Sequence, residues 1–169
     1  MLAAALAVSA LMVLVSVIIQ IGGLAVLIWM MRWRAGRLAG LSYVLQQLGV
    51  ILAVVMGLFL IHALQIWLYA ALYLFLGEFQ TLEAALYFST SSFTTVGYGE
   101  IYLDSGWRLV SAIQSANGFL VLGWSTVFLI SVLSRLRSVE MDWLESRIEP
   151  ELFDHHTQRT DKAEDKQDG

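Results

Sequence analysis

The string Thr94-Thr95-Val96-Gly97-Tyr98-Gly99-Glu100 decides how the rest of the chain is interpreted. It lies in a short polar gap between two long apolar stretches, and it carries glycine at the alternate positions 97 and 99. Successive groups of an ordinary strand point to opposite sides, so a column of carbonyls facing one axis requires alternate residues in conformations that a Cβ disfavours. The two glycines permit such a column.

Backbone carbonyls that face one axis suit a dehydrated monovalent cation, because their oxygens replace its hydration shell. The residues expected to bind the ion are Thr95, Val96, Gly97, Tyr98 and Gly99. In this arrangement the Thr95 hydroxyl lies at the inner mouth, while the side chains of Val96 and Tyr98 point away from the axis. Glu100 follows directly and would concentrate cations outside. An alternative interpretation is a glycine-rich turn between two membrane helices.

The string resembles the Thr-Val-Gly-Tyr-Gly signature of potassium channels, including the tyrosine that non-selective relatives often replace. The resemblance covers roughly residues 43–137, as an outer helix, a pore helix, the filter and an inner helix. It implies a potassium-selective channel subunit that catalyses no reaction, has no cofactor, and conducts K⁺ passively at Thr95, Val96, Gly97 and Tyr98. Because the string occurs once in this chain, the resemblance also implies a homotetramer around one ion path.

The composition is that of an integral membrane protein with an all-α fold. The 169 residues are 58% hydrophobic, include one proline and no cysteine, and have a mean hydropathy of +0.69. The net charge of −4 arises mainly after Ser138, where ten of the fourteen acidic residues lie. This distribution excludes nucleic acid as an obvious partner. We expect three transmembrane helices in a lipid bilayer plus a re-entrant pore helix.

The first apolar stretch, residues 1–31, predicts a transmembrane helix that is additional to the two-helix pore plan. It has no charged residue from Leu2 to Met31 and exceeds the thickness of the hydrocarbon layer. A cleaved signal peptide is the alternative, but such peptides carry positive charge before the apolar core. Here the arginines follow, in the linker 32–42. The positive-inside rule places this linker in the cytoplasm and the N-terminus outside, in a multi-pass protein of the cell membrane.

The second apolar stretch, Tyr43 to Leu76, predicts the outer helix. Its polar residues are expected to face protein rather than lipid; they are Gln46, Gln47, His62 and Gln65. For His62 a hydrogen-bonded histidine inside the bundle and a proton sensor are both open. The segment from Thr81 to Ser92 is too short to cross the membrane and predicts a re-entrant helix, with Thr81 as its N-cap and Glu83 in its first turn.

Residues around the predicted pore helix are expected to support the filter. Tyr87 and Phe88 occupy places where related channels commonly have tryptophans that brace the filter tyrosine, so the packing around Tyr98 is expected to be looser. Ser91 and Glu100 replace a carboxyl pair found in a well-studied bacterial relative. Thr94 completes the predicted support and outer mouth, which together comprise Tyr87, Phe88, Ser91, Thr94 and Glu100.

The third crossing, Trp107 to Leu136, predicts the inner helix of a pore domain that spans residues 43–137. One of its faces carries Phe119, Leu122, Thr126, Ile130 and Ser134 at steps of three and four residues. If this face lines the ion path, Leu122, Thr126 and Ile130 form a candidate gate. Gly118 is a candidate hinge by the resemblance, and close helix packing is an equal alternative. Two roles, hydrogen bonding to other helices and lining the ion path, are both open for Ser115, Asn117 and Ser125.

The acidic tail, residues 138–169, is expected to be cytoplasmic and disordered after about residue 150. The pair His155-His156 lacks the fixed spacing of a metal site, and any regulatory partner of the tail is unknown. Two other functions stay open beside the potassium channel. One is a weakly selective channel for monovalent cations, and the other is a non-conducting membrane subunit that assembles with a partner. An enzyme is not expected, because no nucleophile, base and orienting acid converge.

Overall fold

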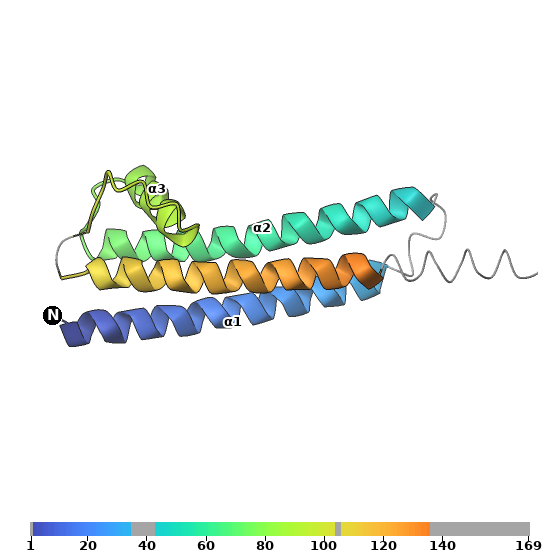
Figure 1. The fold of residues 1–169 in the computed structure, drawn as a ribbon, viewed down its shortest axis with the longest axis horizontal. Helices are drawn as coiled ribbons and strands as arrows, with labels where there is room; N and C mark the ends of the chain where they lie inside the picture. Colours follow the sequence, from blue (N-terminus) through green and yellow to red (C-terminus); the bar gives the residue numbers. More distant parts are fainter. Residues whose placement is uncertain (1, 35–42, 104–105, 136–169) are drawn as a thin grey trace, which may run out of the picture. The chain divides into compact units, whose positions relative to one another are not determined.

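The computed structural model describes residues 2–34, 43–103 and 106–135 (Figure 1). Its long helices are α1 (Leu2–Arg34) and α2 (Tyr43–Phe75), followed by the short α3 (Leu82–Phe93). A further long helix spans Arg108–Arg135 and is called the inner helix below. Three of these helices are long and apolar enough to cross a membrane, over Leu2–Trp33, Gln47–Phe75 and Arg108–Arg135. The all-α membrane fold predicted from the sequence is confirmed.

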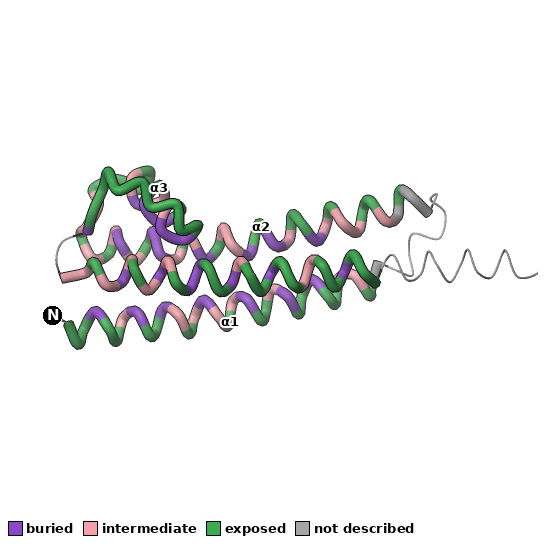
Figure 2. The backbone as a smooth tube through the Cα atoms, viewed as in Figure 1, coloured by how far each residue is buried: buried purple, intermediate pink, exposed green. Residues whose placement is uncertain are grey.

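One stripe of α1 is buried, and it recurs at steps of three and four residues along the whole helix (Figure 2). Its members are Ala5, Ser9, Met12, Ser16, Gln20, Leu24 and Leu27. A matching stripe on α2 consists of Val54, Leu58, Ile61, Gln65, Tyr69 and Tyr73. Side chains at this spacing share one helix face. The remaining faces of the two helices are also apolar and are exposed, so what distinguishes the buried stripes is that they contain polar residues among apolar ones.

Glycines allow α1 and α2 to approach closely. A Cβ on Gly23 of α1 would overlap the side chain of Ile61, and a Cβ on Gly57 of α2 would overlap Leu27. Each helix therefore offers a notch that accepts a branched side chain of its neighbour. Small residues serve this purpose in membranes, where packing replaces the hydrophobic effect as the force between helices.

The short helix α3 begins and ends where its sequence predicts. Thr81 is extended, and its hydroxyl accepts a hydrogen bond from the Ala84 amide at 3.3 Å, so the predicted N-cap is confirmed. Glu83 lies in the first turn, where negative charge is favourable. The helix packs on α2 through an aromatic cluster in which the Phe88 ring lies 5.3 Å from that of Tyr73 and 5.2 Å from that of Phe79. This cluster fixes where the loop after α3 starts.

Residues 1–129 form one compact unit, to which α1, α2, α3 and most of the inner helix belong. Within it the inner helix buries a stripe of its own, consisting of Val110, Gln114, Asn117, Gly118, Val121 and Ser125. The predictions for the Gln46 side chain, for residues 35–42 of the linker and for the tail with His155 and His156 lie outside the described residues.

Candidate functional site

The filter loop, Thr94–Glu100, leaves the C-terminal end of α3 through bonds to the last helical turn. The Thr94 amide and hydroxyl both donate to the Thr90 carbonyl, at 3.0 and 2.8 Å. The Thr95 amide donates to the Ser92 carbonyl at 3.1 Å. These bonds satisfy carbonyls that a helix end otherwise leaves without partners. The loop is thereby tied to α3 from its first residue.

Ser91 holds the next three residues of the filter loop. Its carbonyl accepts from the amides of Val96 and Gly97 at 3.0 and 3.2 Å, and its hydroxyl accepts from the Tyr98 amide at 3.4 Å. The residue predicted to support the filter therefore contacts it at three successive amides.

The amides and the carbonyls of the filter loop differ in their hydrogen-bond partners. The amides of residues 95–98 all donate hydrogen bonds to the end of α3. Among the described residues no hydrogen bond is accepted by the carbonyls of residues 95–98. A backbone carbonyl at membrane depth without a partner is costly unless it faces water, protein or an ion. The loop thus presents a set of four free carbonyl oxygens on a backbone whose donors are already satisfied.

Three alternate residues of the loop have a positive φ: +62° at Thr95, +53° at Gly97 and +75° at Gly99. The alternation was predicted for the two glycines from the sequence, but not for Thr95. A non-glycine residue in this region costs about 1–2 kcal/mol, so Thr95 is a strained position held by the bonds around it. No sequence signal marked it, because threonine does not favour this conformation.

Tyr87 and Phe88 take different roles. The Tyr87 ring stacks on the Tyr98 ring of the filter, with centroids 6.2 Å apart and planes 12° apart. Phe88 instead is buried in the aromatic cluster with Tyr73 and Phe79. One ring of the predicted pair contacts the filter tyrosine, and the other anchors α3.

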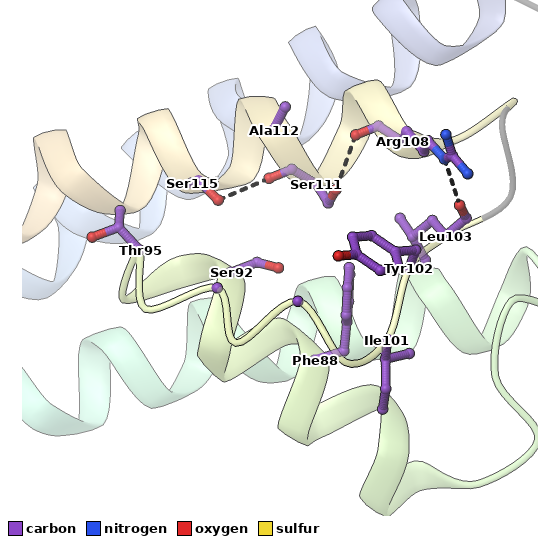
Figure 3. A pocket seen from close by; sticks show the side chains of 12 residues that line it. Phe88, Ser92, Thr95, Ile101, Tyr102, Leu103, Arg108, Ser111, Ala112 and Ser115 are labelled. Carbon is purple, nitrogen blue, oxygen red and sulfur yellow. Dashed lines mark hydrogen bonds between the residues drawn. The ribbon is translucent and has the colours of Figure 1, made fainter.

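A cavity of about 330 Å³ lies between the filter loop and the first turns of the inner helix (Figure 3). Its walls include the same alternate residues that have a positive φ, Thr95, Gly97 and Gly99. Ser111 and Ser115 line the opposite wall, and each donates to a carbonyl of its own helix. Arg108 closes the outer end and donates to the Leu103 carbonyl at 3.2 Å. Ser115 thus lines a cavity. The sequence had not decided between this role and hydrogen bonding to another helix.

Gly118 packs against the end of α3. A Cβ at this position would overlap the Phe93 carbonyl and clash with the rest of that residue's backbone. Close packing, one of the two roles considered for Gly118, is therefore present in the structure. The gate candidates Leu122, Thr126 and Ile130 lie on the outward side of the inner helix, where Leu122 is half-buried and the other two are exposed. Within a single chain, little of this face of the inner helix is buried.

A chain of buried hydrogen bonds joins α1, α2 and the inner helix. Asn117 Nδ2 donates to Ser16 Oγ at 2.8 Å, Ser16 Oγ donates to Gln65 Oε1 at 2.8 Å, and Gln65 Nε2 donates to Gln20 Oε1 at 3.0 Å. Gln20 Nε2 then donates to Ser125 Oγ at 2.8 Å, and that oxygen lies 2.9 Å from His62 Nε2. The expectation that Gln65 and His62 face protein is confirmed, and Asn117 and Ser125 bond other helices.

Sequence reasoning missed the α1 members of this chain. Ser16 and Gln20 lie four residues apart in an otherwise apolar helix, and Ser9 precedes them on the same face. A repeat of polar residues on one face of a membrane helix indicates a protein contact, so the signal was present. It did not reveal the partner, because the spacing on α1 says nothing about which helix lies beside it.

A second set of buried bonds joins α2, α3 and the inner helix behind the filter. Tyr73 Oη donates to Gln114 Oε1 at 2.6 Å, and Gln114 Nε2 donates to the Ser89 hydroxyl and carbonyl at 2.9 and 3.2 Å. Ser89 Oγ in turn donates to the Ile66 carbonyl at 2.8 Å. All polar atoms of the Gln114 amide therefore have partners, and α3 is held on both sides.

Comparison with known families identifies this region. Residues 58–135 match a family model described as "Ion channel". Residues 58–135 are therefore similar to an ion channel and are called the ion-channel domain below. This ion-channel domain runs from the middle of α2 through α3 and the filter loop to the end of the inner helix. No match was found among curated proteins or among solved structures. The helix α1 lies outside the ion-channel domain in sequence, although its side chains bond to it.

Proposed function

We propose that this protein is the subunit of a potassium-selective channel, in which the filter loop of four chains surrounds one ion path. The carbonyls of Thr95, Val96, Gly97 and Tyr98 are the ion ligands, with the Thr95 hydroxyl at the innermost site. K⁺ is the permeating ion, and the protein performs no covalent chemistry. The ion-channel domain supports the class of function, and the filter loop supports the choice of ion.

One observation carries the proposal: the carbonyls of residues 95–98 are free among the described residues while their amides are bonded to α3. A selectivity filter needs this asymmetry, because the oxygens must be available to the ion and the backbone must be stiff. The positive φ at alternate residues is the conformation that lets neighbouring carbonyls face one side. A turn that merely joined two helices would need neither feature.

The exposure of the filter loop in a single chain supports assembly. All residues from Thr94 to Glu100 are exposed, and Val96 and Tyr98 are 54% and 66% exposed. Non-helical backbone at membrane depth is tolerated only when it is covered by protein or lines water. One chain provides too little cover, whereas a ring of four chains encloses the loop and gives one axis. The face with Phe119, Leu122, Thr126 and Ile130 then lines the path, with Gly118 near its upper end.

The test is flux through purified protein in liposomes, measured with K⁺ and with Na⁺ in parallel runs. We expect K⁺ flux without Na⁺ flux. Gly97→Ala is the matched loss variant, because alanine at a φ of +53° is strained although nothing lies within 4 Å of its Cβ. Gly49→Ala is the control, since this helical glycine of α2 also has open space around it and lies far from the loop in sequence.

The outcomes separate the candidate functions. Selective K⁺ flux that is lost in Gly97→Ala and kept in Gly49→Ala supports the proposal. Comparable flux of both ions that still depends on Gly97 identifies a weakly selective cation channel instead. Absence of flux that a partner protein restores identifies a non-conducting subunit. K⁺ selectivity that survives Gly97→Ala refutes the assignment of the filter loop.

A further inference from the structure

The helix α1 is attached to the inner helix at two points, although it lies outside the ion-channel domain. Ser16 accepts from Asn117, and Gln20 donates to Ser125, each at 2.8 Å. The two α1 residues are one helical turn apart, and their partners are about two turns apart on one face of the inner helix. These contacts are specific in their atoms, so α1 has one position along the inner helix rather than a range of positions.

The two inner-helix residues that bond α1, Asn117 and Ser125, differ in how firmly the rest of the structure restrains them. Asn117 adjoins Gly118, which is pressed against the Phe93 backbone at the end of α3, next to the filter loop. Ser125 lies two turns further along, beyond both Gly118 and Gly123. Glycine weakens a helix interior, and sharp bends occur preferentially where such residues lie. A bend in this stretch displaces Ser125 relative to α1 and leaves Asn117 in place.

The bond at Ser125 is the last step of a chain in which the donors run in one direction. Asn117 donates to Ser16, Ser16 to Gln65, Gln65 to Gln20, and Gln20 to Ser125. Ser125 Oγ also lies 2.9 Å from His62 Nε2, so a further hydrogen bond joins it to α2. Moving Ser125 away leaves the Gln20 amide without its acceptor inside the bilayer, where unsatisfied polar groups are costly.

We propose that α1 is a latch on the inner helix: through Gln20 and Ser16 it stabilises the unbent arrangement of that helix and so keeps the ion path closed. Figure 1 shows the inner helix running without a sharp kink. The inference rests on the proposed channel function. It gives α1 a role in opening and closing, which is separate from the selection of ions by the filter loop. Loss of the latch raises the open probability and leaves ion selectivity unchanged, because the side-chain bonds of α1 are to Gln65, Asn117 and Ser125 rather than to the filter loop.

The experiment is single-channel recording of the full chain in planar bilayers, with wild type compared with Gln20→Met and Ser16→Ala. Methionine keeps the length of the Gln20 side chain but removes both polar atoms. Ser9→Ala is the matched control, since Ser9 is buried on the same face of α1 but donates only to the Ala5 carbonyl of its own helix. Ser16→Thr restores a hydroxyl and is expected to restore the wild-type open probability.

We expect the closed-to-open equilibrium constant to rise roughly 3-fold for each subunit that loses a bond, which corresponds to about 0.6 kcal/mol. The ratio of K⁺ to Na⁺ permeability stays at its wild-type value, and Ser9→Ala behaves as wild type. If wild type gives selective unitary currents but Gln20→Met and Ser16→Ala do not open more often, the latch is refuted and the channel function stands. If wild type gives no unitary currents, both the latch and the channel function are refuted.

Discussion

Thr95 is the described non-glycine residue that has a positive φ, at +62°. Its strain is offset locally, because its amide donates to Ser92 and the next two amides donate to the Ser91 carbonyl. Strain of this kind persists only where surrounding bonds over-determine the backbone. In the proposed channel a hydroxyl oxygen at this position would bind an ion at the inner mouth, which would account for threonine rather than glycine.

At the same scale, Ser91→Ala tests whether the serine hydroxyl stiffens the outer half of the filter loop. The substitution removes the acceptor of the Tyr98 amide and keeps the carbonyl that holds Val96 and Gly97. A neutral hydrogen bond contributes about 1 kcal/mol, and at 3.4 Å this one lies at the weak end. We expect a partial loss of K⁺ over Na⁺ selectivity, measured as a shift in reversal potential under mixed-ion conditions. Selectivity equal to wild type would show that the Ser91 hydroxyl does not support the filter loop.

Gly118→Ala is expected to destabilise the protein by about 1–3 kcal/mol, the usual cost of overpacking. The new Cβ overlaps the Phe93 carbonyl, and neither backbone can move without disturbing the start of the filter loop. Gly123→Ala on the same helix is the control, because nothing lies within 4 Å of its Cβ. Alanine there gains helix propensity, so its stability should match or exceed wild type. Thermal unfolding in detergent measures both, and equal stability of the two variants would contradict the packing role.

At the scale of elements, the filter loop depends on how α3 is held between α2 and the inner helix. Gln114 is the central residue of this attachment, because its amide bonds Tyr73 on one side and Ser89 on the other. The aromatic cluster around Phe88 adds contact but no direction. Polar bonds inside the bilayer fix orientation because alternatives leave their atoms unsatisfied. The end of α3, and with it the filter loop, is therefore aimed by side chains that never contact an ion.

Tyr73→Phe tests whether these polar bonds set the orientation of α3. It removes the donor to Gln114 Oε1 and keeps the ring in the aromatic cluster. We expect a loss of about 0.6 kcal/mol in stability and a measurable fall in selectivity, because α3 gains freedom to tilt. Tyr69→Phe is the control, since the buried Tyr69 hydroxyl makes no hydrogen bond within the described part of the chain. A Tyr73→Phe protein that behaves like Tyr69→Phe would show that apolar packing alone aims α3.

At the scale of the whole molecule, three membrane-length helices place the linker after α1 on the opposite side from α3. The positive-inside rule then predicts the side, because Arg32 and Arg34 at the end of α1 and Arg37 after it have no acid among them. In the proposed orientation the filter mouth next to Glu100 lies outside and the tail is cytoplasmic. The proposed latch belongs to this scale as well, since it would couple α1, which lies outside the ion-channel domain, to the inner helix.

The orientation is tested by labelling single cysteines, for which the chain is suited because it has none of its own. Ser42→Cys, in the linker, is expected to react with a membrane-impermeant maleimide only after the cells are opened. Gln80→Cys, exposed before α3, is expected to react in intact cells. Both substitutions are small, so channel flux serves as the check on folding. The reverse pattern of labelling would place the filter mouth inside and overturn the proposed topology.

The sequence by itself determined the number and extent of the helices, the N-cap at Thr81 and the position of the filter loop. These features depend on local signals: uninterrupted apolar length, capping residues and one contiguous string. Ser91 was predicted as a support of the loop from the resemblance to potassium channels, because it stands where a relative has a carboxyl group. The positive φ of Thr95, the separate roles of Tyr87 and Phe88, and the bonds from Ser16 and Gln20 to the inner helix were decided by the tertiary structure. Each depends on which helices lie side by side, and in an apolar chain many faces are equally fit for lipid, so only packing selects among them.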